Sequence, residues 1–402
     1  MVLLPEYNQQ AGEELLDWKY RLIFGKAKKE VKLSWDEISQ LLGIGCSGEY
    51  LRKIAYGVLE YADYQNSKSQ LTDITDAETN ILDELETKRM DMQREKMRMQ
   101  DQKRELNKLL REYARAEHIK SELQAAVKEM ASVKPLCINS VPATGGTREA
   151  ALLLSDWHKG QHSANHWNLY NDVEFYKRIE RLVSKAIAYG KDHDVRCMHV
   201  FSLGDLINGL IHVTTRINST ENSVRQVMAV AEVLAGILVS LAKEFEEVKA
   251  YFSRGNHERV SPNIKESIAS ESFFDVIPWY IEARIKDVPN ITLVENKEND
   301  EIVVANICGQ SCFAVHGHRD KISSVVQNLS LMLRKFPDCV FMAHYHHSEE
   351  NEIHGAEIIV NSSLCGTDSY AAELRRTAKA AQKLIVFDDT EGRLCTYNIK
   401  VA

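Results

Sequence analysis

The sequence predicts an α/β fold over the C-terminal two-thirds of the chain, preceded by a helical module and a long, coiled-coil-like helix. From about residue 149 onward, short apolar runs alternate with helical patterns, which is the order of an α/β sandwich. Residues 76–130 are almost free of Gly, Pro and aromatic residues and are dense in charge. The segment 131–148 holds two of the seven prolines and a Gly-Gly pair, the composition of a linker. We therefore expect a helical module over 1–75, a long helix over 76–130, a linker over 131–148 and a large α/β domain over 149–402.

The overall composition limits the class of protein. Apolar residues make up 44% of the chain, enough for a sizeable core, and the net charge of −8 excludes a uniformly basic nucleic-acid binder. The first residues lack the pattern of a signal peptide, and no apolar stretch of bilayer-spanning length is evident. The eight cysteines are scattered without a CxxC pair, so we expect free thiols in a reducing cytosol. The sequence therefore predicts a cytoplasmic protein without membrane contact.

The first 75 residues contain a helix-turn-helix candidate. Ser34 and Glu37 have the spacing of a capping box that opens one helix, and Ser47 can cap a second helix that closes at Gly57. The second helix would present side chains suited to phosphate and base contacts: Tyr50, Arg52, Lys53 and Tyr56. The alternative is an ordinary helical hairpin, which Glu49 and the acidic neighbours favour.

The expected long helix carries an apolar stripe with a period of seven residues: Leu85, Met92, Met99, Leu106 and Tyr113. The companion seam contains Leu82 and Leu110 but is interrupted by Arg89, Lys96 and Lys103. The stripe predicts self-association through 76–130 or docking of a partner, whereas the charges are typical of a solvated helix laced with ion pairs.

Polar groups follow five apolar runs in the α/β part. The runs 152–154, 199–203, 248–252, 313–315 and 339–342 each lead into such a group. The groups are Asp156-Trp157-His158, Gly204-Asp205, Gly255-Asn256-His257-Glu258, His316-Gly317-His318 and His344-Tyr345-His346. Because ligand sites form outside the carboxyl ends of strands in α/β sheets, we expect these groups to meet. His199, which lies inside a run, is interpreted as a core residue, and His162 and His212 are assigned no role.

The residue types indicate a centre of two divalent metal ions. Two cations held close together need a shared anionic ligand, a role that suits Asp205, and Asp156 and His158 can reach one ion from a single stretch of backbone. Carboxylate, amide and imidazole ligands without thiolate suit manganese best here, with iron or zinc as alternatives. Such a pair activates water and clamps a phosphate. His257 would face the substrate, stabilising the transition state or protonating the leaving oxygen.

The order Asp-x-His, Gly-Asp, Gly-Asn-His-Glu, His-Gly and His-x-His resembles the calcineurin-like metallophosphoesterase superfamily over residues about 149 to 402. The resemblance implies a four-layer fold, a two-sheet β-sandwich flanked by helices, with His257 as the catalytic histidine. It further implies that one metal ion is held by Asp156, His158, Asp205 and His346, and the other by Asp205, Asn256, His316 and His344.

The chain departs from the family pattern at two positions. Ala343 stands where the family usually has Gly before the last His-x-His, and Asn208 stands near the place where the DNA-repair nuclease branch often has a further His. The second departure puts an exonuclease activity in doubt. After the last motif, Tyr370, Arg375 and Arg376 could line the mouth of the site and hold substrate phosphate, or they could lie on a surface helix.

Two functions are consistent with this organisation. The first is a cytosolic metal-dependent phosphodiesterase or nuclease acting on nucleic acid or a nucleotide, because every expected ligand is present. The second comes from the likeness to phage- and prophage-encoded members of the superfamily. Some of these are recombination directionality factors, which bind a large serine integrase on DNA and promote excision, with the phosphoesterase fold as a docking scaffold. The appended helices of about 130 residues favour this second hypothesis.

Overall fold

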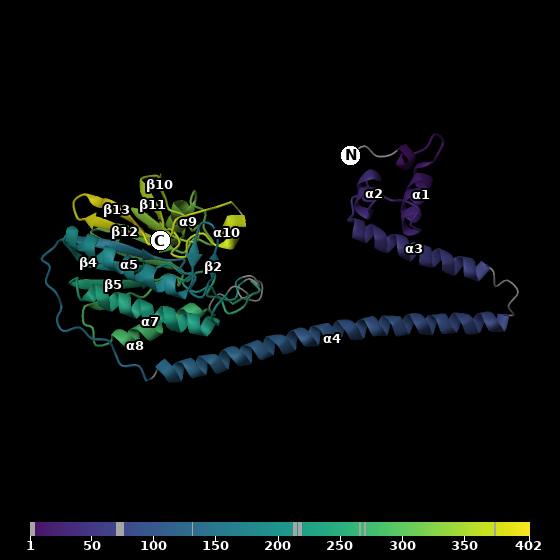
Figure 1. Ribbon diagram of the computed structural model, residues 1–402. Helices are drawn as coiled ribbons and strands as arrows, with labels where there is room; N and C mark the ends of the chain where they lie inside the picture. Colours follow the sequence, from purple (N-terminus) through teal and green to yellow (C-terminus); the bar gives the residue numbers. More distant parts are fainter. Residues whose placement is uncertain are drawn as a thin grey trace. The chain divides into compact units, whose positions relative to one another are not determined.

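The computed structural model describes residues 5–69, 76–130, 132–211, 215, 219–264, 267–268, 271–373 and 375–402, except for the side chains at 68–69, 76–82 and 369–370. The chain forms two compact units, Met1–Arg111 and Glu112–Ala402. The long helix α4, Asp76–Met130, contributes to both units (Figure 1).

The first unit contains three helices ahead of α4, namely α1 (Leu15–Ala27), α2 (Trp35–Leu41) and α3 (Gly48–Ser69), preceded by a short 3-10 turn, Pro5–Tyr7. They pack around a small core centred on Leu22, Ile38 and Leu51. Helix α2 begins at the predicted capping box, in which the Ser34 and Glu37 side chains each accept a hydrogen bond from the other's backbone N–H. The predicted end of the second helix at Gly57 was wrong, because α3 continues to Ser69 with open space around the Gly57 Cα.

Helix α4 runs for 55 residues, about 82 Å at the usual rise per residue. Its predicted stripe, from Leu85 to Tyr113, is more than half exposed at each of its five positions. The last turns differ: Ala126 is buried, and Ile119, Leu123 and Met130 pack against the main core of the second unit. The helix is therefore anchored at its C-terminal end and has an uncovered apolar stripe over 85–113 among the residues that the structure describes.

The second unit is built on two sheets. The six-stranded sheet has the order β13-β12-β1-β4-β5-β6. Its strands are β1 (Arg148–Leu154), β4 (Val195–Ser202), β5 (Glu247–Phe252), β6 (Ile291–Leu293), β12 (Ala381–Asp388) and β13 (Gly392–Lys400). Strands β1, β4, β5 and β6 are parallel, and β12 returns antiparallel to β1.

The five-stranded sheet has the order β10-β11-β9-β8-β7, with β8, β9 and β11 parallel. Its strands are β7 (Ile302–Ile307), β8 (Gln310–Val315), β9 (Cys339–Met342), β10 (Glu349–Ile353) and β11 (Ala356–Val360). A small hairpin of β2 (Ser163–Ala164) and β3 (Leu169–Tyr170) lies outside both sheets.

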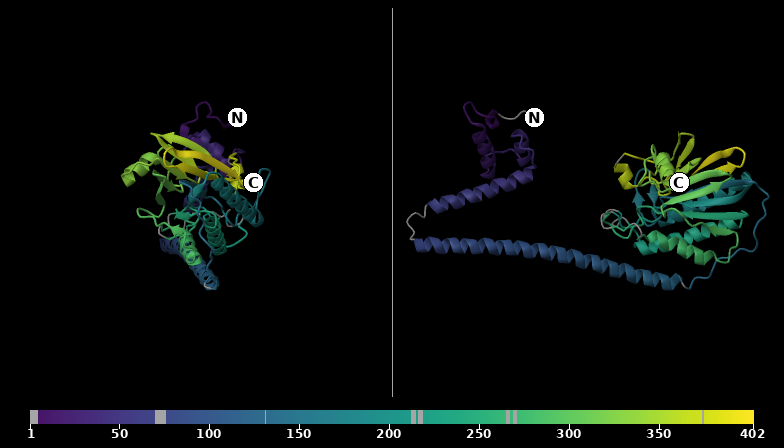
Figure 2. Two further views of the ribbon diagram at one scale, coloured as in Figure 1. Left: turned by 90° about the vertical axis from the view of Figure 1, so that its left-hand side faces the viewer. Right: turned by 180° about the vertical axis from the view of Figure 1, so that it is seen from behind.

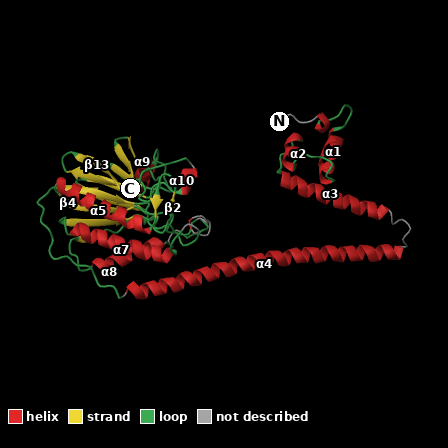
Figure 3. Ribbon diagram, viewed as in Figure 1, coloured by secondary structure: helices red, strands yellow, loops and turns green. Residues whose placement is uncertain are grey.

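Alternation along the strands divides the interior into layers. In β1, Leu152 and Leu154 face the helices α5 (Asp172–Asp192), α7 (Ser223–Ala242) and α8 (Val276–Ile285), whereas Leu153 faces the second sheet. The outer face of the second sheet is covered by α9 (Val325–Leu333). A 3-10 turn, Phe273–Asp275, and the short helix α10, Ser369–Glu373, complete the described elements. The order helix, sheet, sheet, helix, visible in Figure 3, confirms the predicted four-layer α/β fold.

Among the described residues, α7 is the one helix that is long and apolar enough, by length and composition, to cross a membrane. The expectation that no stretch has this character was therefore wrong. In the structure α7 packs against β5, α5 and α8, and 61% of its apolar window is buried. Its apolar composition reflects its place in the core of the second unit.

Candidate metal centre

The segments after β1 and β4 continue side by side and carry the first predicted ligands. Asp156 N–H donates to Gly204 O at 3.1 Å, and His158 N–H donates to Asp205 O at 3.1 Å. The backbone turns left-handed at all three predicted ligands here, with φ of +51° at Asp156, +45° at His158 and +52° at Asp205. His344 and His346 have φ of +71° and +61°. Left-handed backbone is unfavourable for such residues, and its concentration at five predicted ligands indicates a functional constraint.

Two glycines allow the strand ends to meet. A Cβ on Gly204 would lie 2.3 Å from Gly255 N, and a Cβ on Gly255 would lie 2.3 Å from Asp205 Oδ1. Neither position has room for a side chain, because the neighbouring atoms are backbone or a buried carboxylate. This contact between the segments after β4 and β5 brings Asp205 within reach of the residues that follow Gly255.

One group of converging side chains consists of Asp156, His158 and His346. Nε2 of His158 and Nε2 of His346 are 3.2 Å apart, and His346 Nε2 lies 3.3 Å from Asp156 Oδ1. Asp156 is fully buried, and its Oδ2 accepts the His344 backbone N–H at 3.2 Å. Burial raises the pKa of Asp156, but His346 outweighs it and holds that pKa at about 2.

A second group consists of Asp205, His316 and His344. His316 Nε2 lies 3.1 Å from Asp205 Oδ2 and 3.2 Å from His344 Nδ1, while His316 Nδ1 donates to Leu203 O at 2.6 Å. Asn256 joins this group, since its Oδ1 is 3.3 Å from His316 Nε2. Although burial lowers the pKa of His316, Asp205 raises it to about 10 in the metal-free protein.

Asp205 also belongs to a third group, with His158 and His257, so it faces both ends of the site. Its Oδ1 accepts the His257 backbone N–H at 2.9 Å, and its Oδ2 is 3.8 Å from His257 Nε2. The other ring nitrogen of His257, Nδ1, donates to Asn208 O at 2.9 Å, which leaves Nε2 directed to the site. Burial lowers the pKa of His257.

The donor set fits two divalent metal ions. Carboxylate and imidazole atoms converge within 4.8 Å of one another in each group. Asp156 Oδ1 is buried and accepts no hydrogen bond in the described structure, although His346 Nε2 lies 3.3 Å away, so this oxygen has a free position for a cation. Imidazole nitrogens also face each other at 3.2 Å in both groups. Oxygen and nitrogen donors without thiolate match first-row divalent ions.

A supporting layer not foreseen from the sequence holds Asp156 in place. The Ser363 hydroxyl donates to Asp156 O at 3.1 Å, and the Leu364 N–H donates to the same oxygen at 3.2 Å. Arg178, almost fully buried, donates to Leu364 O at 2.8 Å and Cys365 O at 2.9 Å. Most of these contacts run to backbone carbonyl oxygens, which leave no residue-type pattern in the sequence.

Glu258 is the buried acid behind Asp205. Its Oε1 accepts the Leu206 N–H at 2.6 Å, and its Oε2 has no hydrogen-bond partner in the described structure. Burial, with Asp205 nearby, raises the pKa of Glu258 to about 8. The sequence placed Glu258 in a motif but gave it no role.

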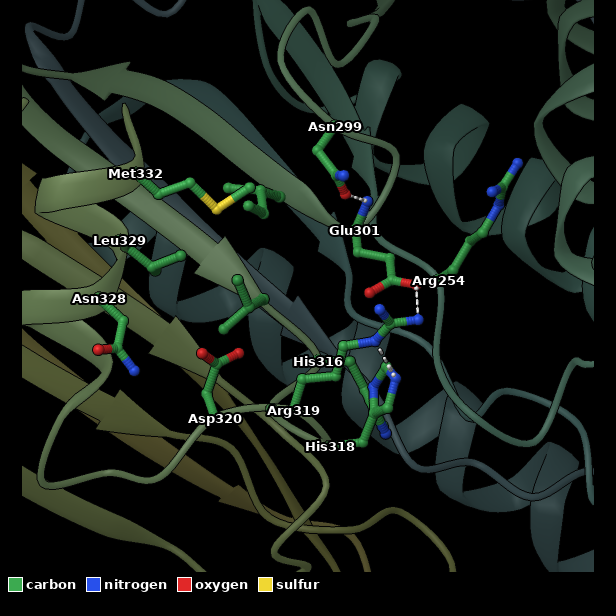
Figure 4. Close-up of a pocket in the computed structure, with 13 residues that line it drawn as sticks. Arg254, Asn299, Glu301, His316, His318, Arg319, Asp320, Asn328, Leu329 and Met332 are labelled. Carbon is green, nitrogen blue, oxygen red and sulfur yellow. Dashed lines mark hydrogen bonds and ion pairs between the residues drawn. The ribbon is translucent and has the colours of Figure 1, made fainter. Parts of the chain in front are cut away.

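A cavity of about 250 Å³ adjoins the second group, because His316 and His318 form part of its wall. Figure 4 shows these histidines opposite Leu329 and Met332. Its two arginines are already paired. Arg319 contacts Glu301 at 2.9 Å, and Arg254 contacts Asp275 and Asp300 at 2.8 and 2.9 Å. The cavity therefore offers mixed apolar and polar walls without a strong positive field.

The structure brings together all seven predicted metal ligands and His257, and the other predicted site residues lie outside these groups. Arg375 and Arg376 are exposed beyond α10, and the Tyr370 side chain lies outside the described residues. In α3, Tyr50 and Tyr56 are exposed, Lys53 lies 3.9 Å from Glu49, and Arg52 donates two hydrogen bonds to Glu49 at 2.7 and 3.0 Å.

The remaining sequence interpretations concern four single residues and the cysteines. His199 is a fully buried core residue whose ring contacts Tyr251 OH and Glu149 Oε2, both at 3.0 Å. The backbone at Ala343 is not in the left-handed region, so the methyl group that replaces the family's usual Gly causes no backbone strain there. Asn208 is buried, with its side chain tied to Ser219 Oγ at 2.7 Å. His212 lies outside the described residues, and all eight cysteines are free.

The sequence profile of the calcineurin-like phosphoesterase family matches residues 151–367, which include every predicted metal ligand. The chain belongs to this family. The family resemblance seen in the sequence is thereby confirmed, and membership implies divalent metal ions at the phosphoesterase centre.

Known proteins resemble the chain over different extents. The SPbeta prophage-derived uncharacterized protein YonJ of Bacillus subtilis (strain 168) is 24% identical over 406 residues, covering 97% of each chain. Among solved structures, a novel archaeal phosphodiesterase has 12% identity and a TM-score of 0.32, covering 62% of this chain and 99% of its own. Vps29 of Entamoeba histolytica in complex with zinc has 13% identity and a TM-score of 0.30, with the same coverages.

Proposed function

We propose that this protein is a metal-dependent phosphodiesterase of phage or prophage origin that cleaves nucleic acid or a nucleotide in the bacterial cytosol. The observation that supports this proposal most strongly is that Asp205 lies in two converging ligand groups, each of which contains one buried and one partly buried histidine. The likeness to a prophage-derived protein over 97% of both chains supports the proposed origin. The free thiols suit the cytosol.

The proposed centre holds two ions, most simply manganese. Asp156, His158 and His346 would hold one ion, Asn256, His316 and His344 the other, and Asp205 would bridge them. When bound, the ions supply Lewis-acid stabilisation of the phosphate charge and lower the pKa of the attacking water.

The protein's own contribution to the reaction is orientation and proton transfer. The hydrogen bond from Nδ1 to Asn208 O fixes the His257 ring with Nε2 facing the site, and in the imidazolium form Nε2 would donate its proton to the leaving oxygen. Exposed Arg375 and Arg376 would attract the phosphates of the substrate, and the cavity beside His316 would receive the part beyond the scissile bond.

Hydrolysis of bis-p-nitrophenyl phosphate with added manganese tests the proposal. Asp205→Asn keeps the side-chain shape but removes the shared charge. We expect a loss of at least about 10³-fold in kcat, since metal-ion catalysis contributes several kcal/mol. Asp194→Asn is a matched control, because Asp194 is also a left-handed aspartate, with φ of +52°, in the turn between α5 and β4. Wild-type protein that binds manganese but does not hydrolyse this ester or oligonucleotides would refute the proposal.

One observation favours a second function, that of a recombination directionality factor docking on a large serine integrase–DNA complex. The apolar stripe of α4 over 85–113 is exposed and takes no part in the phosphoesterase centre. A phosphoesterase for small substrates needs no such surface, whereas helix pairing uses one. For this function, substitution of the stripe would abolish excision while Asp205→Asn would not; the reverse result would exclude it.

The same stripe could pair two copies of the protein, and its charges select the orientation. A parallel in-register pair would place Arg89, Lys96 and Lys103 against their own copies. An antiparallel pair instead sets Met92 opposite Lys103 and Met99 opposite Lys96, where the aliphatic stems can cover the methionines. We therefore propose that any self-association through 76–130 is antiparallel.

A further inference from the structure

Four large apolar side chains stand exposed between β2 and the first turns of α5. Trp167 is 57% exposed, and Leu169, Val173 and Tyr176 are exposed to a similar degree within the same ten residues. We call these four residues the Trp167 ridge. Exposed apolar clusters of this kind on a folded domain mark binding surfaces.

The turn that carries Trp167 is rigidly held. Asn165 Oδ1 accepts the backbone N–H groups of Trp167 and Asn168, both at 2.9 Å. The side chain of Asn165 donates to Thr367 O at 3.1 Å, and that of Asn168 donates to Cys365 O at 2.7 Å. These hydrogen bonds fix the backbone that presents the exposed Trp167 side chain, so little backbone conformational entropy remains to be lost when a ligand binds.

The loop 363–367 holds both the turn that carries Trp167 and the metal-ligand residue Asp156. The carbonyl oxygen of Cys365 accepts the hydrogen bond from the Asn168 side chain, and the backbone N–H of Cys365 donates to Asp156 O at 3.4 Å. This second contact lies next to the Ser363 and Leu364 contacts described above. Figure 1 places β2 and α10 at the same edge of the second unit, and the rear view in Figure 2 shows the yellow-green helix α10 at that edge as well. The ridge is therefore separated from a metal-ligand residue by a single loop, 363–367.

Charge around the ridge favours a polyanion. Beyond α10, Arg375 and Arg376 are exposed without a carboxylate in ion-pairing distance among the described residues. The chain after Arg376 runs back to the loop 363–367, because Thr367 Oγ1 donates a hydrogen bond to Ala378 O at 3.0 Å. Of the acids near the ridge, Asp172 pairs with Lys159 at 2.9 Å, Glu174 pairs with Lys177 at 3.0 Å, and Asp368 caps α10 by accepting the Ala371 N–H at 2.6 Å, while Glu373 is exposed.

We propose that the Trp167 ridge is a base-stacking platform for a single nucleic-acid strand whose scissile phosphate lies at the metal centre. The proposal rests on the proposed phosphodiesterase function and specifies its substrate as a polynucleotide strand. The Trp167 and Tyr176 rings stack on bases, and Arg375 and Arg376 pair with flanking phosphates. Every base has a flat face, so the platform selects single strands rather than a sequence.

The test measures binding of fluorescein-labelled oligothymidylate to the full-length, manganese-loaded protein by fluorescence anisotropy. Trp167→Ala is expected to raise Kd about tenfold, because the stacking of one base on an aromatic side chain usually contributes this much to the binding free energy. Trp167→Phe should restore most of the affinity, because it keeps an aromatic face. Trp279→Ala is the matched control: Trp279 is 54% exposed but lies on α8, and its loss should leave Kd unchanged.

Hydrolysis of bis-p-nitrophenyl phosphate is measured in parallel, so that the platform and the metal centre can fail separately. The proposal predicts that Trp167→Ala loses about tenfold more kcat/KM on the oligonucleotide than on the small ester. Equal Kd values for wild type and Trp167→Ala, or equal losses in Trp167→Ala and Trp279→Ala, would overturn the platform. Wild-type protein that hydrolyses the ester but binds no oligonucleotide would also overturn it while leaving the phosphodiesterase proposal standing.

Discussion

Substitution of Gly204 by alanine should damage the metal centre and the fold together. Gly204 has φ of +79°, and an added Cβ would lie 2.3 Å from Gly255 N and 2.5 Å from Gly255 Cα. To restore an ordinary contact the two segments must separate by roughly 1 Å. The left-handed backbone costs about 1–2 kcal/mol and the overpacking about 1–3 kcal/mol, so we expect a loss of about 2–5 kcal/mol in unfolding free energy.

The same displacement separates Asp205 from His257, whose backbone hydrogen bond is 2.9 Å long. Misplacement of this size costs roughly 10²-fold in catalysis. Urea unfolding and manganese-dependent ester hydrolysis measure the two effects. Gly236→Ala is the control, since a Cβ there meets nothing within 4 Å in helix α7, and it should stabilise the protein by about 0.5–1 kcal/mol. If Gly204→Ala matched wild type in stability and rate, the close-approach argument would be refuted.

Three further predictions follow from single contacts. Ser363→Ala removes the hydroxyl bonded to Asp156 O, so kcat should fall and unfolding free energy should drop by about 1–3 kcal/mol; unchanged manganese affinity and rate would contradict this. Glu258 has a folded pKa of about 8 against an ordinary 4.5, so the folded state holds its proton more tightly. The metal-free protein should therefore lose stability as pH rises from 4.5 to about 8, by at most about 1.4 kcal/mol per unit, and Glu258→Gln should flatten the curve measured by urea titration. Met99→Glu with Leu106→Glu should turn any dimer into a monomer in light scattering, while ester hydrolysis persists; a dimer that survives would place the contact elsewhere.

The sequence predicted some features of the fold correctly and missed others. The alternation of strands and helices suffices to predict an α/β domain, because hydrophobic periodicity is local information, whereas the four-layer arrangement was implied by the family resemblance. The membrane-like composition of α7 was missed because Arg225 and Glu232 interrupt the apolar run, although they occupy few of its 20 positions. The end of α3 was missed because Gly57, with open space around it, is tolerated inside a helix.

The tertiary structure decided which residues serve the ligands. Ser363, Cys365 and Arg178 act through backbone carbonyls, and carbonyl contacts leave no residue-type signature in a sequence. The i,i+3 spacing of Glu49 and Arg52 allows an ion pair on a helix. The sequence alone does not tell whether Arg52 forms this pair or contacts DNA, and the structure shows the pair.

The sequence by itself determined the chemistry of this protein: the ligand types, their order along the chain and the family that shares that order. Only the tertiary structure decided that Asp205 faces two groups at once, that the Trp167 turn and Asp156 both contact Cys365, and that the α4 side chains of the stripe are exposed over 85–113 among the described residues. The physical reason is the range of the interactions. Strand periodicity and turn chemistry act over a few residues, whereas the approach of Gly204 to Gly255, or of Asn168 to Cys365, joins segments that only the packing of the sheets brings together.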